Sequence, residues 1–418
     1  MKRCEVDRSK LAPMMAKYME IKDNYEDTII FFRLGDFYEM FFEDAETVSK
    51  ELSLTLTGRQ AGLSERVPMC GVPYHAYQSY VSKLIDKGYK VAICEQLTDP
   101  KESKGMVERD IVQVITRGTL LDNLNYANEF NYIASIYAFK DCYAFTYADI
   151  STGDIYSIIL KDEESLYREL INLSIKEVIV NSEVNREILY NYFFFQKNNY
   201  NILITITDEV EEYETYDYIY SGVNDLRLIT SIKHLLTYIT KTKKTNLKYL
   251  TKVVLNNEND HLIFDYHTKK NLELTETIRD NSRNNSLLWL MDKTKTAMGS
   301  RLLKQNLVSP FTNLDLIERR FNYIDSLRKN FLVKENLTTS LNEIYDLERL
   351  IGRISYGNLN ARDMYQLLKS LDVLPSIKEE LIKINYDKNL ETLDELTDLL
   401  RRSINPNAPL TLKEGGLI

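Results

Sequence analysis

The stretch Phe31-Phe32-Arg33-Leu34-Gly35-Asp36-Phe37-Tyr38-Glu39-Met40-Phe41-Phe42 decides how the N-terminal part of the chain folds. It predicts a strand, a tight turn at Leu34-Gly35-Asp36 and a second strand. On the second strand Phe37 and Glu39 share a face, because side chains on a strand repeat every two residues. A phenyl ring beside a carboxylate suits a nucleobase, since the ring can unstack a base step while the acid contacts the base edge.

The composition bounds the class of protein. A chain of 418 residues with 44% hydrophobic and 28% charged residues predicts two to four globular domains. No apolar run approaches the roughly 20 residues that span a bilayer, and the first residues lack the apolar core of a secretory signal. We therefore expect a cytoplasmic protein without membrane contact. The four cysteines lie far apart and form neither a zinc motif nor a disulfide framework.

The charge balance argues against a simple nucleic-acid-binding module. The net charge is -9, and residues 1–120 contain 17 basic and 19 acidic residues, whereas such a module is usually basic. Either the protein does not bind DNA, or it uses a wedge and local deformation while most phosphate-binding charge lies elsewhere.

The hydrophobic pattern divides the chain into three parts. Residues 1–120 alternate helices and strands and predict a mixed α/β domain. Residues 130–250 predict a second α/β layer that begins with a three-stranded meander, and helices dominate afterwards. The expected elements are helices at 11–22, 44–52 and 77–87 and strands at 90–95 and 111–116; strands at 132–139, 142–149, 154–160, 177–180 and 201–206 with helices at 163–173 and 184–194; and helices at 223–242, 271–279, 284–293, 297–306, 313–330, 335–352, 360–383 and 390–403.

The Gly35-Asp36-Phe37-Tyr38-Glu39 run resembles the mismatch-reading Phe-x-Glu motif of the MutS family of DNA mismatch repair proteins. Further segments resemble landmarks of that family in the same order and cover nearly the whole chain. They are Pro13-Met14-Met15, Val67-Pro68-Met69-Cys70-Gly71-Val72-Pro73-Tyr74-His75, Val91-Ala92-Ile93-Cys94-Glu95-Gln96, Val107-Glu108-Arg109, Thr268-Lys269-Lys270-Asn271-Leu272-Glu273, Met298-Gly299-Ser300-Arg301-Leu302-Leu303 and Asp346-Leu347-Glu348-Arg349-Leu350.

The resemblance implies a multidomain fold. Residues 1–120 would form the mixed α/β mismatch-recognition domain, residues 130–250 a ribonuclease-H-like α/β connector domain, and residues 251–418 an all-α set of core and lever helices. The family continues beyond this point into a lever helix, a DNA clamp and an ATPase domain. We therefore expect the helical part to be truncated.

The resemblance assigns mismatch binding to Phe37 and Glu39. Phe37 would enter the minor groove and stack on a mispaired base, and Glu39 would hydrogen-bond that base. Taken alone, a phenylalanine on a strand is usually part of a core. Glu39 on the same face makes a sealed core costly unless the carboxylate has a partner.

The other candidate residues have plain structural alternatives. Asp36 can stabilise the turn. Arg109 can be a surface charge, contact phosphate, or support the loop through an ion pair with Asp36. Arg59 can bind a backbone phosphate or be solvated. Met69, Tyr74 and His75 lie in a proline-bracketed loop that can reach the minor groove or simply pack.

We expect no catalytic residue and no metal site. Asp149 occupies a strand end where ribonuclease-H-type nucleases keep a metal ligand, but partner acids are missing, so a turn-forming role is favoured. The four histidines are scattered without a metal-binding spacing. A nuclease is thus the weakest reading.

No glycine is followed by lysine, so the phosphate-binding motif G-x-x-x-x-G-K-[ST] is absent. ATP and Mg²⁺ are therefore expected only for the ATPase domain of full-length family members, and this chain is not expected to be an enzyme. The partners that the resemblance implies are double-stranded DNA with mismatches or small insertion/deletion loops, a MutL-like protein and, in full-length proteins, a second copy, all in the bacterial cytosol or nucleoid. The alternative function is a truncated, non-catalytic scaffold that contacts MutL-like repair partners.

Overall fold

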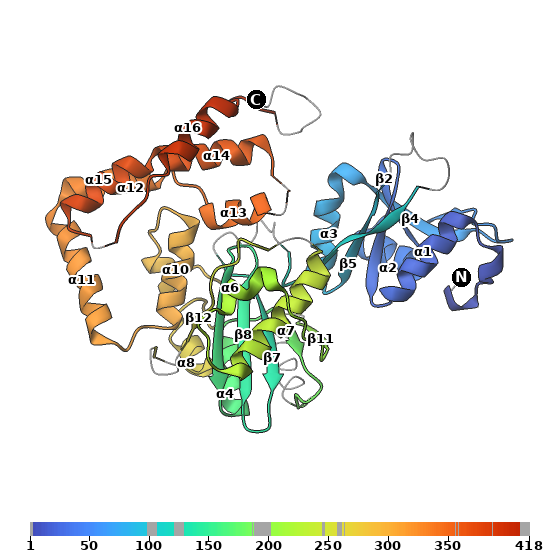
Figure 1. The fold of residues 1–418 in the computed structure, drawn as a ribbon, viewed down its shortest axis with the longest axis horizontal. Helices are drawn as coiled ribbons and strands as arrows, with labels where there is room; N and C mark the ends of the chain where they lie inside the picture. Colours follow the sequence, from blue (N-terminus) through green and yellow to red (C-terminus); the bar gives the residue numbers. More distant parts are fainter. Residues whose placement is uncertain are drawn as a thin grey trace.

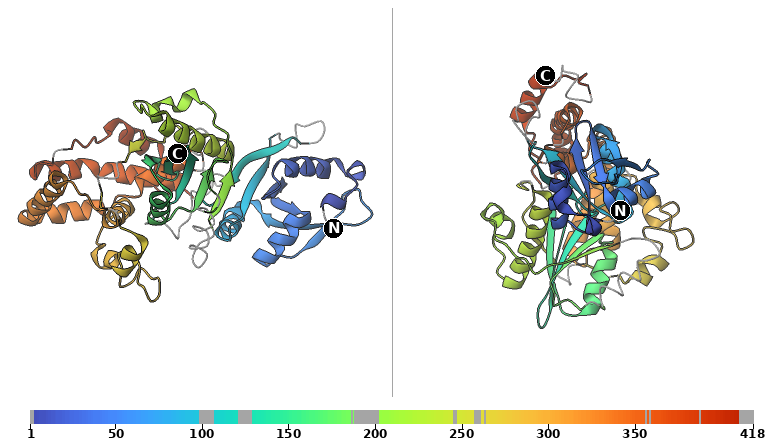
Figure 2. Two further views of the ribbon diagram at one scale, coloured as in Figure 1. Left: turned by 90° about the horizontal axis from the view of Figure 1, so that it is seen from below. Right: turned by 90° about the vertical axis from the view of Figure 1, so that its right-hand side faces the viewer.

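The computed structural model describes residues 3–97, 107–120, 129–185, 187, 202–244, 247–256, 261–262, 264–355, 357, 359–386 and 388–409. Figure 1 shows three successive parts: an N-terminal sheet with its helices, a second sheet, and a set of helices toward the C-terminus. In the left view of Figure 2 the N-terminal sheet lies at one end of an elongated molecule. None of the helices within these ranges has the length and apolar character needed to cross a lipid bilayer.

The first part is a six-stranded mixed sheet in the order β3-β4-β2-β1-β5-β6. The predicted hairpin is confirmed, since β1 and β2 are antiparallel and Leu34 pairs with Phe37. On its other side β1 runs parallel to β5, and β4 pairs with β2. The elements are α1 (Pro13–Asn24), β1 (Thr28–Leu34), β2 (Phe37–Phe41), α2 (Phe42–Leu52), β3 (Thr57–Arg59), β4 (Val67–Pro73), the 3₁₀ turn η3 (Tyr74–Ala76), α3 (Tyr77–Asp86), β5 (Lys90–Gln96) and β6 (Arg109–Ile115).

Helices cover both faces of this sheet. Tyr18 and other apolar residues of α1 pack with Phe32 and Phe41 on one face. Helices α2 and α3 pack on the opposite face, where Phe31 and Tyr38 lie. Alternate residues of each strand therefore serve two separate cores, as the period of two requires.

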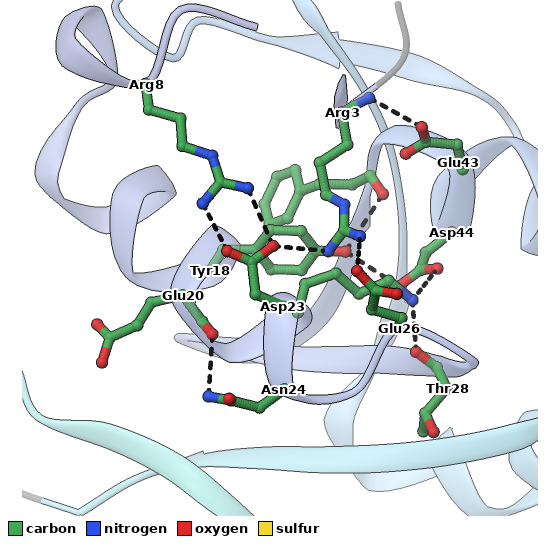
Figure 3. A network of polar contacts seen from close by, with 12 residues as sticks. Arg3, Arg8, Tyr18, Glu20, Asp23, Asn24, Glu26, Thr28, Glu43 and Asp44 are labelled. Atoms are coloured by element: carbon green, nitrogen blue, oxygen red, sulfur yellow. Dashed lines mark hydrogen bonds and ion pairs between the residues drawn. The ribbon is translucent and has the colours of Figure 1, made fainter. Parts of the chain in front are cut away.

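A polar network fixes the N-terminal segment to this domain (Figure 3). The guanidinium groups of Arg3 and Arg8 both reach Asp23 at the end of α1. Deeper in the domain, Lys22 and Asp44 form an ion pair of 2.8 Å, and both side chains are buried. A buried pair of this kind holds α1 and α2 in one arrangement around β1.

The second part is also a six-stranded sheet, in the order β11-β10-β7-β8-β9-β12. The predicted meander of β7, β8 and β9 is confirmed, and β10 and β11 join it in parallel on the other side of β7. The elements are β7 (Tyr132–Ala138), β8 (Tyr143–Asp149), β9 (Asp154–Leu160), α4 (Glu163–Asn172), β10 (Glu177–Val180), β11 (Leu203–Ile206), α6 (Asp217–Tyr220), α7 (Leu226–Lys243) and β12 (Val254–Leu255).

Two cores again flank the sheet. Apolar residues of α4 pack on one face and those of α7 on the other. Helix α7 begins with Asp225 as its N-cap, whose side chain accepts from the Arg227 amide. The helix expected at 184–194 lies mostly outside the described residues, so that prediction stays open.

The third part is helical, with corrections to the expected bounds. The helix expected at 271–279 is wrong: the chain is helical just before it, in α8, and turns afterwards. The helix expected at 335–352 is two helices, and the one expected at 360–383 breaks before Pro375, whose ring fits the first turn of a new helix and not a helix interior. The elements are α8 (Tyr266–Asn271), α9 (Leu287–Met291), α10 (Ala297–Val308), α11 (Leu314–Lys329), α12 (Phe331–Leu341), α13 (Leu347–Ser355), α14 (Ala361–Asp372), α15 (Leu374–Lys383) and α16 (Asp394–Ser403).

A buried cluster of ion pairs lies at the break before α13. Arg301 of α10 is fully buried and donates to both carboxylate oxygens of Asp346 at 2.7 Å, and it also pairs with Glu348. This ion pair holds the start of α13 against α10. Helix α13 in turn touches the second sheet, since a Cβ at Gly352 would lie 2.7 Å from the Ser151 carbonyl oxygen.

Candidate nucleic-acid interface

The Phe37 side chain is exposed to solvent next to the turn of the first hairpin. Gly35 supplies the left-handed conformation (φ +57°) that the tight turn requires. Phe37 is 48% exposed, whereas Phe31, Phe32 and Phe41 are fully buried. Because Phe37 lies next to the turn of a hairpin whose other phenylalanines are buried, its ring is the apolar group that this hairpin presents to a ligand.

Glu39 lies on the same sheet face as Phe37, opposite Gly71 of β4. Its carboxylate forms an ion pair with Arg59 of the edge strand β3. The exposed fractions of these side chains are 16% for Glu39 and 36% for Arg59, so the pair lies at the border of the solvent. The charge of Glu39 thus has the partner that its partial burial requires.

A second cluster supports the turn from the opposite face. The guanidinium of Arg33 donates to the Gly35 carbonyl at 2.5 Å and stacks on the Tyr74 ring, 3.8 Å from its centroid. The Tyr38 hydroxyl donates to Glu95, which lies 3.8 Å from Arg33. Burial, together with the Glu95 carboxylate, raises the pKa of Tyr38 well above its ordinary value. The turn is therefore held rigidly in place.

Arg33 and Glu95 were not predicted as site residues. Arg33 could have been found, because it is a charged residue within the otherwise apolar strand 28–34. Nothing in the sequence pattern placed Glu95 next to it, because their contact depends on β1 and β5 being neighbours.

Arg109 has a structural position. Its side chain is buried and donates to the Arg33 and Val107 carbonyl oxygens at 3.2 and 3.0 Å. It lies 5.4 Å above the Phe32 ring. Burial lowers the pKa of Arg109. These contacts fit a residue that supports the loop and not a solvated surface charge, and they do not include Asp36. Phosphate contact by Arg109 stays a prediction.

The remaining candidates surround the turn. Asp36 is exposed, and its carbonyl accepts from the Tyr74 amide at 2.9 Å, which joins the hairpin to η3. Tyr74 packs against the core beneath α3, whereas His75 is exposed beside it. Met69 shares the sheet face of Glu39 and packs partly on the α1 core. The structure thus gathers Phe37, Glu39, Arg59 and Met69 on one face.

Asp149 closes a turn in the second sheet. Its carboxylate is fully buried and accepts from the Asn131 amide and from the amide and hydroxyl of Ser151, at 2.6 to 2.8 Å. Burial raises the pKa of Asp149. Within the described ranges, no three His, Cys, Asp or Glu side chains gather as metal ligands would. These contacts give Asp149 a structural role.

Comparison with known proteins matches three successive family models to the chain. They are MutS domain I at residues 12–124, MutS domain II at 131–251 and MutS domain III at 267–418. The chain belongs to the MutS family. The exposed ring and the acid beside it lie in the segment that matches domain I.

Individual curated proteins named MutS are also similar to the chain in sequence. The chain is 43% identical over 414 residues to the DNA mismatch repair protein MutS of Geobacillus sp. (strain WCH70). The aligned region covers 97% of this chain and 48% of that protein. It is 41% identical over 415 residues to MutS of Staphylococcus haemolyticus, with 98% and 46% covered. It is 42% identical over 425 residues to MutS of Clostridium tetani, with 98% and 48% covered. The chain therefore spans about half the length of the curated relatives it matches.

Proposed function

We propose that this chain binds double-stranded DNA at mispaired or unpaired bases. The observation that carries the proposal is the half-exposed Phe37 ring at the end of a rigid hairpin, with Glu39 two residues along the same face. Phe37 enters the minor groove and stacks on the mispaired base, and Glu39 hydrogen-bonds that base. Mismatched steps unstack and bend more easily than paired steps, so the wedge gains a few kcal/mol of discrimination.

The rigid turn makes such a wedge effective. A ring that must separate two stacked bases works only if its own support does not yield. The stacking of Arg33 on Tyr74 and the hydrogen bond from the Tyr74 amide to Asp36 provide that support on both sides of Gly35. Little conformational freedom is then lost on binding, which favours affinity.

The other two parts of the chain have proposed roles in transmission. The β9-β8-β7-β10-β11 arrangement, a meander extended by two parallel strands, supports a ribonuclease-H-like connector domain. The helices after residue 251 would be core and lever helices that couple the DNA-bound state to an ATPase domain, with ATP and Mg²⁺ bound there. The phosphate-binding motif is absent from these 418 residues, so no ATP-dependent step is assigned to them. A cytosolic bacterial homodimer that acts with a MutL-like protein is the corresponding proposal for longer members of the family.

Replacing Phe37 with alanine tests the proposal. Fluorescence anisotropy compares binding of the chain to labelled duplexes that differ only by one mismatch. We expect the unmodified chain to prefer the mismatched duplex and Phe37→Ala to bind both alike. The matched control is Phe321→Ala, which removes another exposed ring, 62% exposed, in α11. A Phe37→Ala variant that keeps the preference refutes the wedge.

A protein-binding scaffold is the second candidate function. Six exposed acids lie within residues 208–217 of the second part, three of them paired with Lys233 or Lys241, and the chain carries a net charge of -9. Such a surface favours a basic partner over DNA, and a MutL-like protein is the partner that we propose for this role. The salt dependence of DNA affinity separates the candidates: a slope near zero favours the scaffold, and a steep negative slope favours DNA binding.

A further inference from the structure

Arg59 reaches Glu39 from two strands away. Strand β4 lies between β3 and β2, where Arg59 pairs with Val67 and Glu39 pairs with Gly71. Positions 67 and 71 of β4 share a face because they are an even number of residues apart. The Arg59 side chain therefore crosses β4 diagonally to meet the carboxylate.

The Glu39 side chain lies next to Gly71 of β4. A Cβ at Gly71 would lie 3.5 Å from the Glu39 Cγ and 3.3 Å from the Tyr38 carbonyl oxygen. With glycine there, the Glu39 side chain lies close over the backbone of β4, on the side from which Arg59 arrives. The ion pair thus joins a carboxylate and a guanidinium that the sheet itself places together.

The pair matters because Glu39 belongs to a surface proposed to bind a polyanion. A bare carboxylate close to DNA phosphates is repelled, and the repulsion is strong where both groups are partly desolvated. A carboxylate neutralised by Arg59 is not repelled in this way. A displaced base can take the place of this partner by offering its hydrogen-bonding edge to Glu39.

We propose that Arg59 is a positioning residue that sets mismatch specificity by serving as the exchangeable counter-ion of Glu39. On paired DNA the ion pair stays closed and shields the carboxylate from the phosphates. At a mismatch the base replaces Arg59 as the partner of Glu39. This inference rests on the proposed function and adds to it how paired DNA is tolerated during search.

The test is the Arg59→Gln variant of the full chain, with mismatched and paired duplexes in the same anisotropy assay. Without its counter-ion, Glu39 repels paired DNA, whereas at a mismatch the base still provides a partner. We expect the ratio of mismatched to paired affinity to rise about two- to fivefold, the size of a partly exposed ion pair. Arg59→Lys keeps the positive charge and should restore the ratio of the unmodified chain.

Two further variants separate this role of Arg59 from a general loss of positive charge and from effects that do not depend on the charge of Glu39. Arg66→Gln removes an exposed charge from the same β3–β4 hairpin and should weaken both complexes by the same factor. In a Glu39→Gln background, Arg59→Gln should leave the ratio unchanged, because there is no charge left to shield. Thermal unfolding of each variant checks that the domain remains folded.

The outcomes distinguish failure of the proposed role of Arg59 from failure of the proposed function. An unchanged or lower ratio in Arg59→Gln overturns the inference, as does an increase that persists in the Glu39→Gln background. If Phe37→Ala still abolishes the preference, the proposed function stands in either case. An unmodified chain that binds both duplexes alike contradicts the proposed function and this inference together.

Discussion

The buried ion pair between Lys22 and Asp44 gives the sharpest prediction about stability. The Asp44 carboxylate accepts from the Lys22 ammonium at 2.8 Å and from the Tyr18 hydroxyl and the Ile30 amide at 3.0 Å. Asp44→Ala leaves the buried ammonium with the Thr28 carbonyl, at 2.6 Å, as its remaining hydrogen-bond partner of those described. We expect the first domain to lose stability and to become more mobile around β1.

The magnitude follows from burial. Removing one partner of a buried ion pair costs about 3–5 kcal/mol, because an uncompensated charge stays in the interior. The two donors that also lose their acceptor act in the same network, so their contributions do not simply add. Removing both charges, in Lys22→Met with Asp44→Leu, should recover most of the loss, since apolar replacements of buried pairs are often neutral.

The assay must report on the first domain alone. The single tryptophan, Trp289, lies in α9 of the helical part, so its fluorescence does not follow the N-terminal sheet. Hydrogen exchange measured by mass spectrometry on peptides of β1 and β2 gives the local free energy of opening. A loss below about 1 kcal/mol in Asp44→Ala, typical of a surface pair, refutes the reasoning. So does a double variant as unstable as the single one.

Two further predictions concern the contact of α13 with the second sheet and a histidine buried in the second part. Gly352→Ala places a Cβ 2.7 Å from the Ser151 carbonyl oxygen. We therefore expect the free energy of unfolding to fall by about 1–3 kcal/mol and hydrogen exchange to become faster in α13 and in residues 149–153. Unchanged exchange in both segments contradicts the contact. His234 is fully buried between the Ser135 hydroxyl and the Thr207 carbonyl, and burial lowers its pKa below 6.5. The unfolded chain then takes up a proton at a higher pH than the folded chain, so this group makes stability fall as pH drops below 6.5. Urea unfolding from about pH 7.5 to about pH 5.5 should show a flatter pH dependence in His234→Gln than in the unmodified chain; equal slopes exclude this role.

Local pattern was sufficient for the first hairpin. The alternation around Leu34-Gly35-Asp36 gave the strands, the turn and the shared face of Phe37 and Glu39, because these depend on neighbours in sequence. For that face the sequence left two outcomes open, exposure near Phe37 or a partner for Glu39. The structure has both, since Phe37 is half exposed and Glu39 pairs with Arg59.

Contacts between side chains on distant strands could not be predicted from local pattern. The partners of Arg33, Glu39 and Arg109 all depend on the strand order of the sheet, which a single sequence does not specify. Arg109 therefore remained a candidate for phosphate contact, although it lies buried over Phe32. Helix periodicity likewise ran across the break before α13, where Asp346 binds the buried Arg301 of another helix.

Bending of a mismatched duplex by Phe37 is the most direct test of the central proposal. Energy transfer between dyes at the two ends of a short duplex reports the end-to-end distance when the chain binds. We predict higher transfer on a mismatched duplex than on the paired one, and a return to the paired value with Phe37→Ala at saturating protein. Equal transfer with Phe37→Ala and the unmodified chain on the mismatched duplex would contradict the proposal that this ring opens the base step.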